Sequence, residues 1–440
     1  MKRLTWLIAL LPLLTPLASA AQDASPADST QAFRLESAAQ RLVEAGFVNV
    51  RAVETPEFTA FTVENDYYKI PAEGFARAAR ILEGSGLDAS KPIKLIGTAG
   101  KVPELTLSYL PETGAWRTTK RLDTSWDAVR KQPMMNNSAL RTDITVYPVL
   151  SLTNLIITQV YQTLWELKPA LEVDLWPGAR FSYQLVIPVF TDFFENKYHL
   201  VHPGVISLSQ RFRDPWHLNI LGKFTVGQFT GNRFGAALEA AYWFPNERFW
   251  VDTQLGLVSE GYFVGFKWKY YWEPQFVWNV AGNYYNAALN TQFTLRAQRF
   301  LFGDYGLKFE MIRHFRHCSI GFYAERGLLF DGHGGLKPKS VQPHSNGGFR
   351  IHVSLPPYRA RRHGRVPRIT TSGQTIFDYN ANNEQYYYKE FRTEAADNLV
   401  SRYFHNRGDA IAYLSKAGSD AALRSTTLED VFVDVAGRKL

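Results

Sequence analysis

Alternation of apolar and polar residues between Thr142 and Leu355 restricts the fold of this chain more than any other feature. Short stretches of period two follow one another, separated by Gly, Pro, Asn and Asp. In one of them, Leu307, Phe309 and Met311 face one way, and Lys308 and Glu310 face the other. This pattern predicts β-strands with one apolar and one polar face, and we expect about 12–14 antiparallel strands.

The alternation alone does not identify the environment, because the apolar face of a strand can contact either a protein core or lipid. Very large residues such as Trp268 and Tyr270 on the apolar faces, and full charges on the polar faces, favour lipid. Aromatic residues make up 14% of the chain, which is typical of barrels with aromatic rings at the lipid–water boundary. The sequence predicts a mainly β fold with a transmembrane antiparallel β-barrel; a secreted soluble β-protein is the alternative.

The first twenty residues indicate export. Lys2 and Arg3 precede an apolar run, Leu4–Leu14, that is too short to span a bilayer as a stable helix. A small-residue cleavage signal follows at residues 18–20, so we expect a signal peptide over residues 1–20, with an uncleaved anchor as the alternative. With the barrel pattern, this predicts the outer membrane of a Gram-negative bacterium as the location and its lipid as a partner.

A small α/β domain is expected before the barrel. Residues 21–32 are small and polar and predict a linker, and residues 33–135 form the domain, which we place in the periplasm. Two segments have helical spacing and end at glycine, Ala38–Ala45 and Ala72–Leu82. Four segments alternate as strands: Val48–Val53, Phe58–Val63, Ile93–Ile96 and Glu104–Tyr109.

The barrel is expected over residues 136–356, with Asn346–Leu355 as its closing strand. Pro356 and Pro357 end that strand, because proline cannot donate to a sheet ladder. An even number of strands would return the chain to the periplasm. Residues 357–440 are therefore expected to form a C-terminal periplasmic segment that opens with a basic run, Arg359–Arg365, and contains a helix over Glu394–Phe404.

The order of segments resembles a known family. A small α/β domain is followed by PGARFSYQLVIPVFTDFF, RFGAALEAAYWFPN, FLFGDYGLKFEMIRHF and GFRIHVSLPP. This arrangement is similar to that of the YjbH-like exopolysaccharide and capsule biosynthesis proteins, over about residues 100–356. The resemblance implies an exported outer-membrane barrel that works with the periplasmic components of a polysaccharide secretion system. It brings no catalytic residues with it.

Charged residues on the polar faces are the candidate site. We expect nine of them to line the barrel interior: Arg180, Lys223, Glu239, Asp252, Lys267, Lys269, Arg296, Lys308 and Glu310. One interpretation is a structural network of ion pairs that fills the interior. The other is a polar path in which Lys and Arg bind acidic sugars. The alternation predicts the interior location, whereas only the resemblance implies a polysaccharide.

Catalytic and metal signatures are weak. His314, His317 and Cys318 suggest a metal, but residues three apart on a strand face opposite sides. Neither a phosphate-binding glycine loop nor a G-x-S-x-G motif is present. We expect no enzyme activity, cofactor or metal, and no nucleic acid partner despite the net charge of +8. A barrel hydrolase acting on lipid or glycan, with Ser319 and His317, and a structural barrel that docks periplasmic partners are the alternatives.

Overall fold

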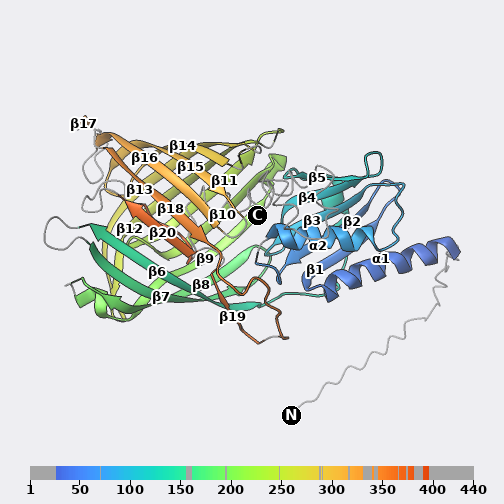
Figure 1. Cartoon of the computed structure of the whole chain (residues 1–440), viewed down its shortest axis with the longest axis horizontal. Coiled ribbons are helices and arrows are strands. Elements are labelled where there is room, and N and C mark those ends of the chain that lie inside the picture. Colours follow the sequence, from blue (N-terminus) through green and yellow to red (C-terminus); the bar gives the residue numbers. More distant parts are fainter. Residues whose placement is uncertain are drawn as a thin grey trace, which may run out of the picture.

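The computed structural model describes residues 26–395 except 70, 155–160, 194–195, 247, 287–288, 290, 316–317, 331–338, 341–344, 365, 373–374 and 381–389. The described chain is mainly β. A small N-terminal mixed α/β sheet stands at one end of a much larger, mostly antiparallel sheet (Figure 1). The expected signal peptide lies outside the described residues.

The N-terminal domain contains five strands in the order β1-β2-β3-β4-β5. Strands β2 and β3 are parallel, because α2 carries the chain back between them, and the other pairs are antiparallel. Its elements are α1 (Pro26–Glu44), β1 (Phe47–Glu54), β2 (Thr59–Asn65), α2 (Pro71–Glu83), β3 (Ile93–Ala99), β4 (Val102–Leu110), β5 (Ala115–Thr119) and α3 (Thr124–Val129).

Helical periodicity explains how this domain closes its core. Leu42 of α1 and Leu82 of α2 are fully buried in one cluster with Phe61 of β2, so both helices cover one face of the sheet. On the opposite face, Val129 of α3 packs with Ala60 of β2 in a second cluster. The two expected helices and four expected strands of this domain are confirmed.

The expected linker over residues 21–32 is wrong for residues 26–32, which belong to α1. Proline is tolerated in the first turn of a helix, and the small polar residues after Pro26 carry only a modest helix penalty. They extend a helix whose buried residues, Ala38 and Leu42, anchor it to the domain. Residues 21–25 lie outside the described part of the chain.

The large sheet has fifteen strands, of which the short β17 and β19 lie off the main ladder, leaving thirteen. From β6 to β16 each strand pairs antiparallel with the next. The strands are β6 (Thr142–Asn154), β7 (Tyr161–Asp174), β8 (Ala179–Thr191), β9 (His202–Arg213), β10 (Ile220–Phe229), β11 (Arg233–Trp243), β12 (Phe249–Val264), β13 (Lys267–Asn286), β14 (Thr291–Arg299), β15 (Asp304–His314), β16 (Cys318–Phe330), β17 (Lys339–Ser340), β18 (Ser345–Val353), β19 (Arg368–Thr371) and β20 (Thr375–Asn380).

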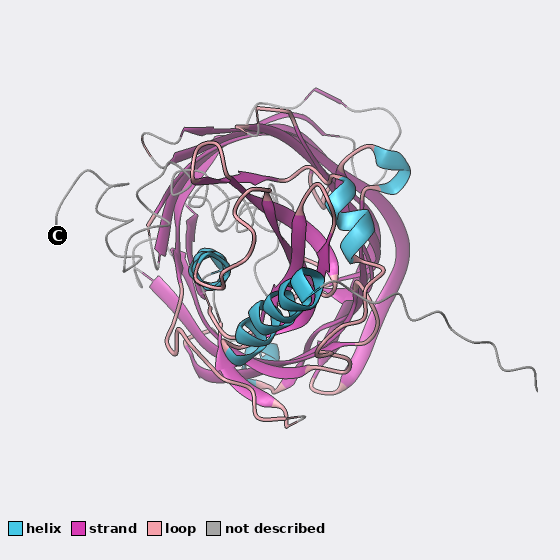
Figure 2. Ribbon diagram, turned by 90° about the vertical axis from the view of Figure 1, so that its right-hand side faces the viewer, coloured by secondary structure: helices cyan, strands magenta, loops and turns pink. Residues whose placement is uncertain are grey.

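The sheet curves around an interior (Figure 2). Strand β16 pairs with β18, β18 with β20, and β20 reaches β6, so the two ends of the sheet approach each other. In the described residues, β20 and β6 are joined by one pair only, Phe377 with Leu150, and they run parallel. Strand β19 also lies parallel to β6, through Arg368–Thr371. The coarse prediction of a mainly β protein with a large antiparallel sheet is therefore confirmed, and complete closure is not seen.

The expectation that Asn346–Leu355 forms the last strand is wrong. β18 ends at Val353, before Pro356 and Pro357, and the chain then turns back and adds β20 on the far side of β18, with six residue pairs from Gly348–Asn380 to Val353–Thr375. The strand pattern of Thr375–Asn380 is too short to stand out in the sequence, and its place depends on the edge left open by β18. None of the helices in the described part of the chain is long and apolar enough to cross a membrane.

Candidate functional site

In the curved sheet, charged side chains point inward and are buried, whereas large apolar side chains point outward and are exposed. Along β15, Lys308 and Glu310 point inward and are buried, while Leu307, Phe309 and Met311 point outward and are exposed. The same holds in β14, where Arg296 is buried and Leu295 is 56% exposed. Of the nine residues expected in the interior, six are almost fully buried there: Lys223, Glu239, Asp252, Arg296, Lys308 and Glu310.

The prediction that Lys267 and Lys269 face the interior is wrong, because both side chains are exposed. They lie where β12 and β13 extend beyond their neighbours as a two-stranded ribbon. Strand β11 stops pairing with β12 at Glu260, and β14 stops pairing with β13 at Trp278. A register shift near Val258 further separates this ribbon from the sheet. Alternation continued through the region, but no interior exists there for the lysines to face.

Arg180 is partly buried and lies near the N-terminal domain. Its Nε donates to Asp174 Oδ1 at 2.9 Å, and Glu172 is 3.9 Å away. Asp252 in the interior accepts a hydrogen bond from Asn283 Nδ2 at 2.7 Å. Both predicted site residues are therefore engaged with polar groups of neighbouring strands.

Six side chains form what we call the Glu390 cluster: Arg296, Lys308, Glu310, Glu325, Arg350 and Glu390. The Lys308 Nζ lies 2.8 Å from Glu325 and 3.1 Å from Glu390. The Arg350 guanidinium lies 3.0 Å from Glu310 and 3.9 Å from Glu390. Glu310 is also 3.7 Å from Arg296. The cluster joins four neighbouring strands, β14, β15, β16 and β18, to a residue beyond β20.

A second group, the Glu394 cluster, contains Lys223, Glu239, Thr393 and Glu394. The Lys223 Nζ lies 2.7 Å from Glu239 and 2.8 Å from Glu394. The Thr393 hydroxyl donates to Glu239 at 3.0 Å. Burial alone would raise the pKa of Glu394, but Lys223 and Arg211 outweigh it and lower that pKa to about 2. Glu394 therefore remains a carboxylate at neutral pH.

Residues Glu390–Ala395, which we call the interior segment, thus lie inside the curved sheet. Arg392 N donates to Thr230 Oγ1 at 2.8 Å, and Thr230 N donates to Arg392 O at 3.0 Å. Phe391 is buried and stacks on Phe229, with ring centroids 5.5 Å apart. Residues 357–440 were expected to form a periplasmic segment. β19 and β20 belong to the large sheet and the interior segment lies inside it, so a segment separate from the sheet is wrong for these residues. The expected helix over Glu394–Phe404 lies outside the described residues except at its first two positions.

The N-terminal domain lies across one end of the interior (Figure 2). Val102 of β4 is buried in one cluster with Leu221, Trp243 and Trp250 of the large sheet. The Lys120 Nζ lies 3.8 Å from the centroid of the Trp243 ring, close enough for a cation–π contact. The two parts of the chain therefore share a buried apolar contact at this end.

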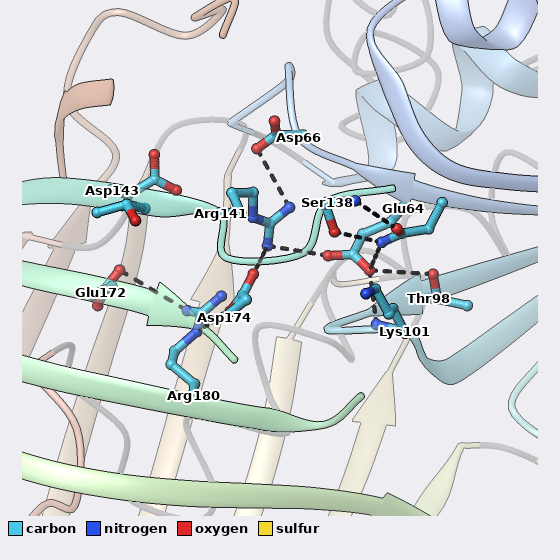
Figure 3. Close-up of polar contacts among 12 residues, drawn as sticks. Glu64, Asp66, Thr98, Lys101, Ser138, Arg141, Asp143, Glu172, Asp174 and Arg180 are labelled. Carbon is cyan, nitrogen blue, oxygen red and sulfur yellow. Dashed lines mark hydrogen bonds and ion pairs between the residues drawn. The ribbon is translucent and has the colours of Figure 1, made fainter. Parts of the chain in front are cut away.

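Arg141 is the centre of a polar junction between the two sheets (Figure 3). Its guanidinium lies 3.0 Å from Glu64, 3.4 Å from Asp66 and 2.6 Å from Asp174. Burial alone would lower the pKa of Arg141, but the three carboxylates outweigh it and raise that pKa above its ordinary value. Because Glu64 and Asp66 belong to the N-terminal domain and Asp174 to β7, this one cation joins both parts.

The basic run after Pro357 adds to the same junction. Arg362 pairs with Asp66 at 3.1 Å and with Asp143 at 2.7 Å, and Arg359 pairs with Glu73 of α2. Arg368 at the start of β19 also contacts Asp66 and Asp143. The sequence shows this run clearly, but its carboxylate partners lie more than 200 positions away along the chain, so only the fold reveals them.

Some interior residues were missed by the sequence analysis. Arg350 and Glu325 lie on the polar faces of β18 and β16, and their alternation was a usable signal. Glu390 gave no signal, and Glu394 was expected only as the first residue of a helix. His314 Nδ1 lies 3.0 Å from Ser319 Oγ across β15 and β16, a Ser–His contact that does not involve His317, which is outside the described residues. Within the described part of the chain, no three His, Cys, Asp or Glu side chains are grouped to hold a metal.

Comparison with family models, curated proteins and solved structures gives no match to this chain. Evidence for function therefore comes from the residues of this chain and from the resemblance in the order of its segments.

Proposed function

We propose that the large sheet is an outer-membrane β-barrel, and that the protein is a non-enzymatic component that assists secretion or assembly of an exopolysaccharide or capsule. The observation that supports the membrane part is the reversed distribution of polarity. Inward faces carry buried charges such as Lys223 and Arg296, and outward faces carry exposed Leu, Phe and Trp. A lipid environment reverses the usual preference in this way, because the lumen is the polar side of a barrel.

The outward apolar residues are contiguous. Across three adjacent strands, Phe224 pairs with Leu238, and Leu238 with Leu255, and all three side chains are exposed. Farther along the same outward face, Leu295 of β14 pairs with Phe309 of β15, and both side chains are exposed. A monomeric soluble protein rarely exposes an apolar surface that spans several strands, whereas a lipid-facing band requires one.

The role in polysaccharide secretion rests on the family resemblance, and the described interior is compatible with it because it is rich in buried cations. A structural barrel that docks periplasmic partners is a second candidate. The pairing of Lys223 with Glu239 and of Lys308 with Glu325 favours it, since these charges compensate each other.

Two experiments test the proposal. Membrane fractionation followed by a heat-modifiability gel should place the protein in the outer membrane as a band whose mobility changes on heating. Deletion of the gene should then reduce the polysaccharide exported by the cell, and the full-length chain should restore it. A soluble protein without a heat-modifiable band would contradict the membrane part. Unchanged export would leave only the structural candidate.

A further inference from the structure

The interior segment presents two carboxylates and a hydroxyl, groups that also occur in an acidic sugar chain. The carboxylates belong to Glu390 and Glu394 and the hydroxyl to Thr393, and Phe391 and Arg392 stand between the two carboxylates in the sequence. Glu390 is held by Lys308 and Arg350, and Glu394 by Lys223. These cations come from three different strands, β15, β18 and β10, so the binding groups are already assembled by the sheet.

The ion pairs of the Glu390 cluster indicate that it binds an anionic group. The strands supply three cations to it, Arg296, Lys308 and Arg350, and two carboxylates, Glu310 and Glu325. Arg296 and Lys308 are almost fully buried. Burying charges is costly unless they are paired, and Glu390 adds a third carboxylate to these three cations. Its bonds with Lys308 and Gln298, both at 3.1 Å, are charge-assisted.

Between the two carboxylates the sheet offers an apolar surface. Phe391 stacks on Phe229 and packs with Val258, Val277 and Leu301. Gly256 leaves the space for its ring, since a Cβ at that position would lie 2.7 Å from Phe391 Cζ. Flat apolar surfaces next to anion-binding groups suit the apolar faces of sugar rings that carry carboxylates.

We propose that the Glu390 and Glu394 clusters form a binding site for an acidic polysaccharide, and that the interior segment occupies this site in cis. The proposal rests on the proposed function, whose substrate class it names. Ligand and segment compete for Lys223, Lys308 and Arg350, so binding of the one displaces the other. Apparent affinity for the ligand is reduced by the fraction of molecules in which the segment is bound.

The test uses the purified full-length chain in detergent micelles and an oligogalacturonate as the probe, with binding measured by calorimetry. The variant Glu390→Gln with Glu394→Gln weakens the segment and should bind the probe at least about tenfold more tightly than the wild type. The matched control replaces two exposed carboxylates of the N-terminal domain, Glu57→Gln with Glu112→Gln, and should leave the affinity unchanged. A neutral maltohexaose should bind to none of them.

A second variant releases the segment without changing any charge. In Phe391→Ala the segment loses its stacking on Phe229 while the apolar surface stays open, and tighter binding of oligogalacturonate is again expected. A third experiment keeps the residues of both clusters unchanged. A thiol introduced by Ala395→Cys in a Cys318→Ser background should react faster with a maleimide when oligogalacturonate is added, because the probe displaces the segment that carries the thiol. Maltohexaose should have no effect.

Equal affinity of wild type and both variants, or a thiol whose reactivity ignores the probe, would overturn the inference. Polysaccharide export in the deletion strain separates this failure from failure of the proposed function. Export that needs the protein, with no displacement by the acidic probe, rejects the inference alone. Displacement by the probe with unchanged export rejects the secretion role and keeps the binding site.

Discussion

Lys223 and Glu239 face each other on β10 and β11, with the Lys223 Nζ 2.7 Å from a Glu239 carboxylate oxygen and both side chains 0% exposed. Glu394 reaches the same ammonium group from the interior segment. A lysine that contacts two buried carboxylates thus connects two strands of the sheet with the chain that follows β20.

We expect Lys223→Met to lower the free energy of unfolding by about 3–5 kcal/mol, because Glu239 and Glu394 would remain buried without their cation. Adding Glu239→Gln and Glu394→Gln to this variant should restore most of the loss. Denaturant titration in micelles measures both effects, and Lys131→Met, at an exposed position, is the control. A triple variant less stable than the single one would show that the charges do not act as a unit.

The cost of placing a charge on the outward face depends on whether that face contacts lipid or water. Phe309 is exposed and lies between Leu295 and Ala324 on the neighbouring strands. In lipid, Phe309→Arg should cost about 2–4 kcal/mol near the membrane midplane. On a water-facing surface the same change stays within about 0.5 kcal/mol. Unfolding in lipid vesicles, with Phe309→Leu as the control, distinguishes the two, and a neutral Phe309→Arg would contradict the barrel.

Truncation tests the place of the last strand. A chain ending after Pro357 lacks β19, β20 and both carboxylates of the interior segment, and we expect it to lose the heat-modifiable band. A chain ending after Ala395 keeps every described contact and should retain the band. Insertion of the shorter chain would mean that β18 can close the sheet on its own.

Lys69 supplies a prediction for pH. Its Nζ donates to Leu355 O at 2.7 Å and to Thr371 O at 2.9 Å, and burial together with Arg368 lowers its pKa from 10.5 to about 8. Between these values the unfolded chain binds more protons than the folded one, so the Lys69 contribution to stability rises with pH across this window. The difference in melting temperature between wild type and Lys69→Gln should therefore change between pH 8 and 10.5, and a constant difference would contradict the shifted pKa.

The alternation of apolar and polar residues was enough to predict the faces of individual strands. Alternation placed Lys308, Glu310 and Leu307 on the correct faces, because period two is a property of the strand itself. The same rule failed at Lys267 and Lys269, where β12 and β13 extend beyond the sheet. Alternation predicts which residues share a face of a strand, but it does not predict whether neighbouring strands bury that face.

The candidate site depends on contacts that are distant in sequence. Lys223 and Glu394 are 171 positions apart, and Lys308 and Glu390 are 82 apart. The inward cations could be predicted from alternation, but the segment that binds them could not, because six residues without strand alternation do not show where they lie in the fold. Position in the finished fold, rather than local propensity, puts these carboxylates inside.

The odd number of strands in the main ladder has a consequence for how the protein is assembled. Because β6 and β20 run in the same direction, β20 ends at the end of the sheet opposite the N-terminal domain. Asn380 therefore lies at that far end, and Thr230, just after the end of β10, exchanges two hydrogen bonds with Arg392 of the interior segment. If β6 and β20 lie in a membrane, the chain that carries Glu390–Ala395 has to cross it with β20 before the interior is filled.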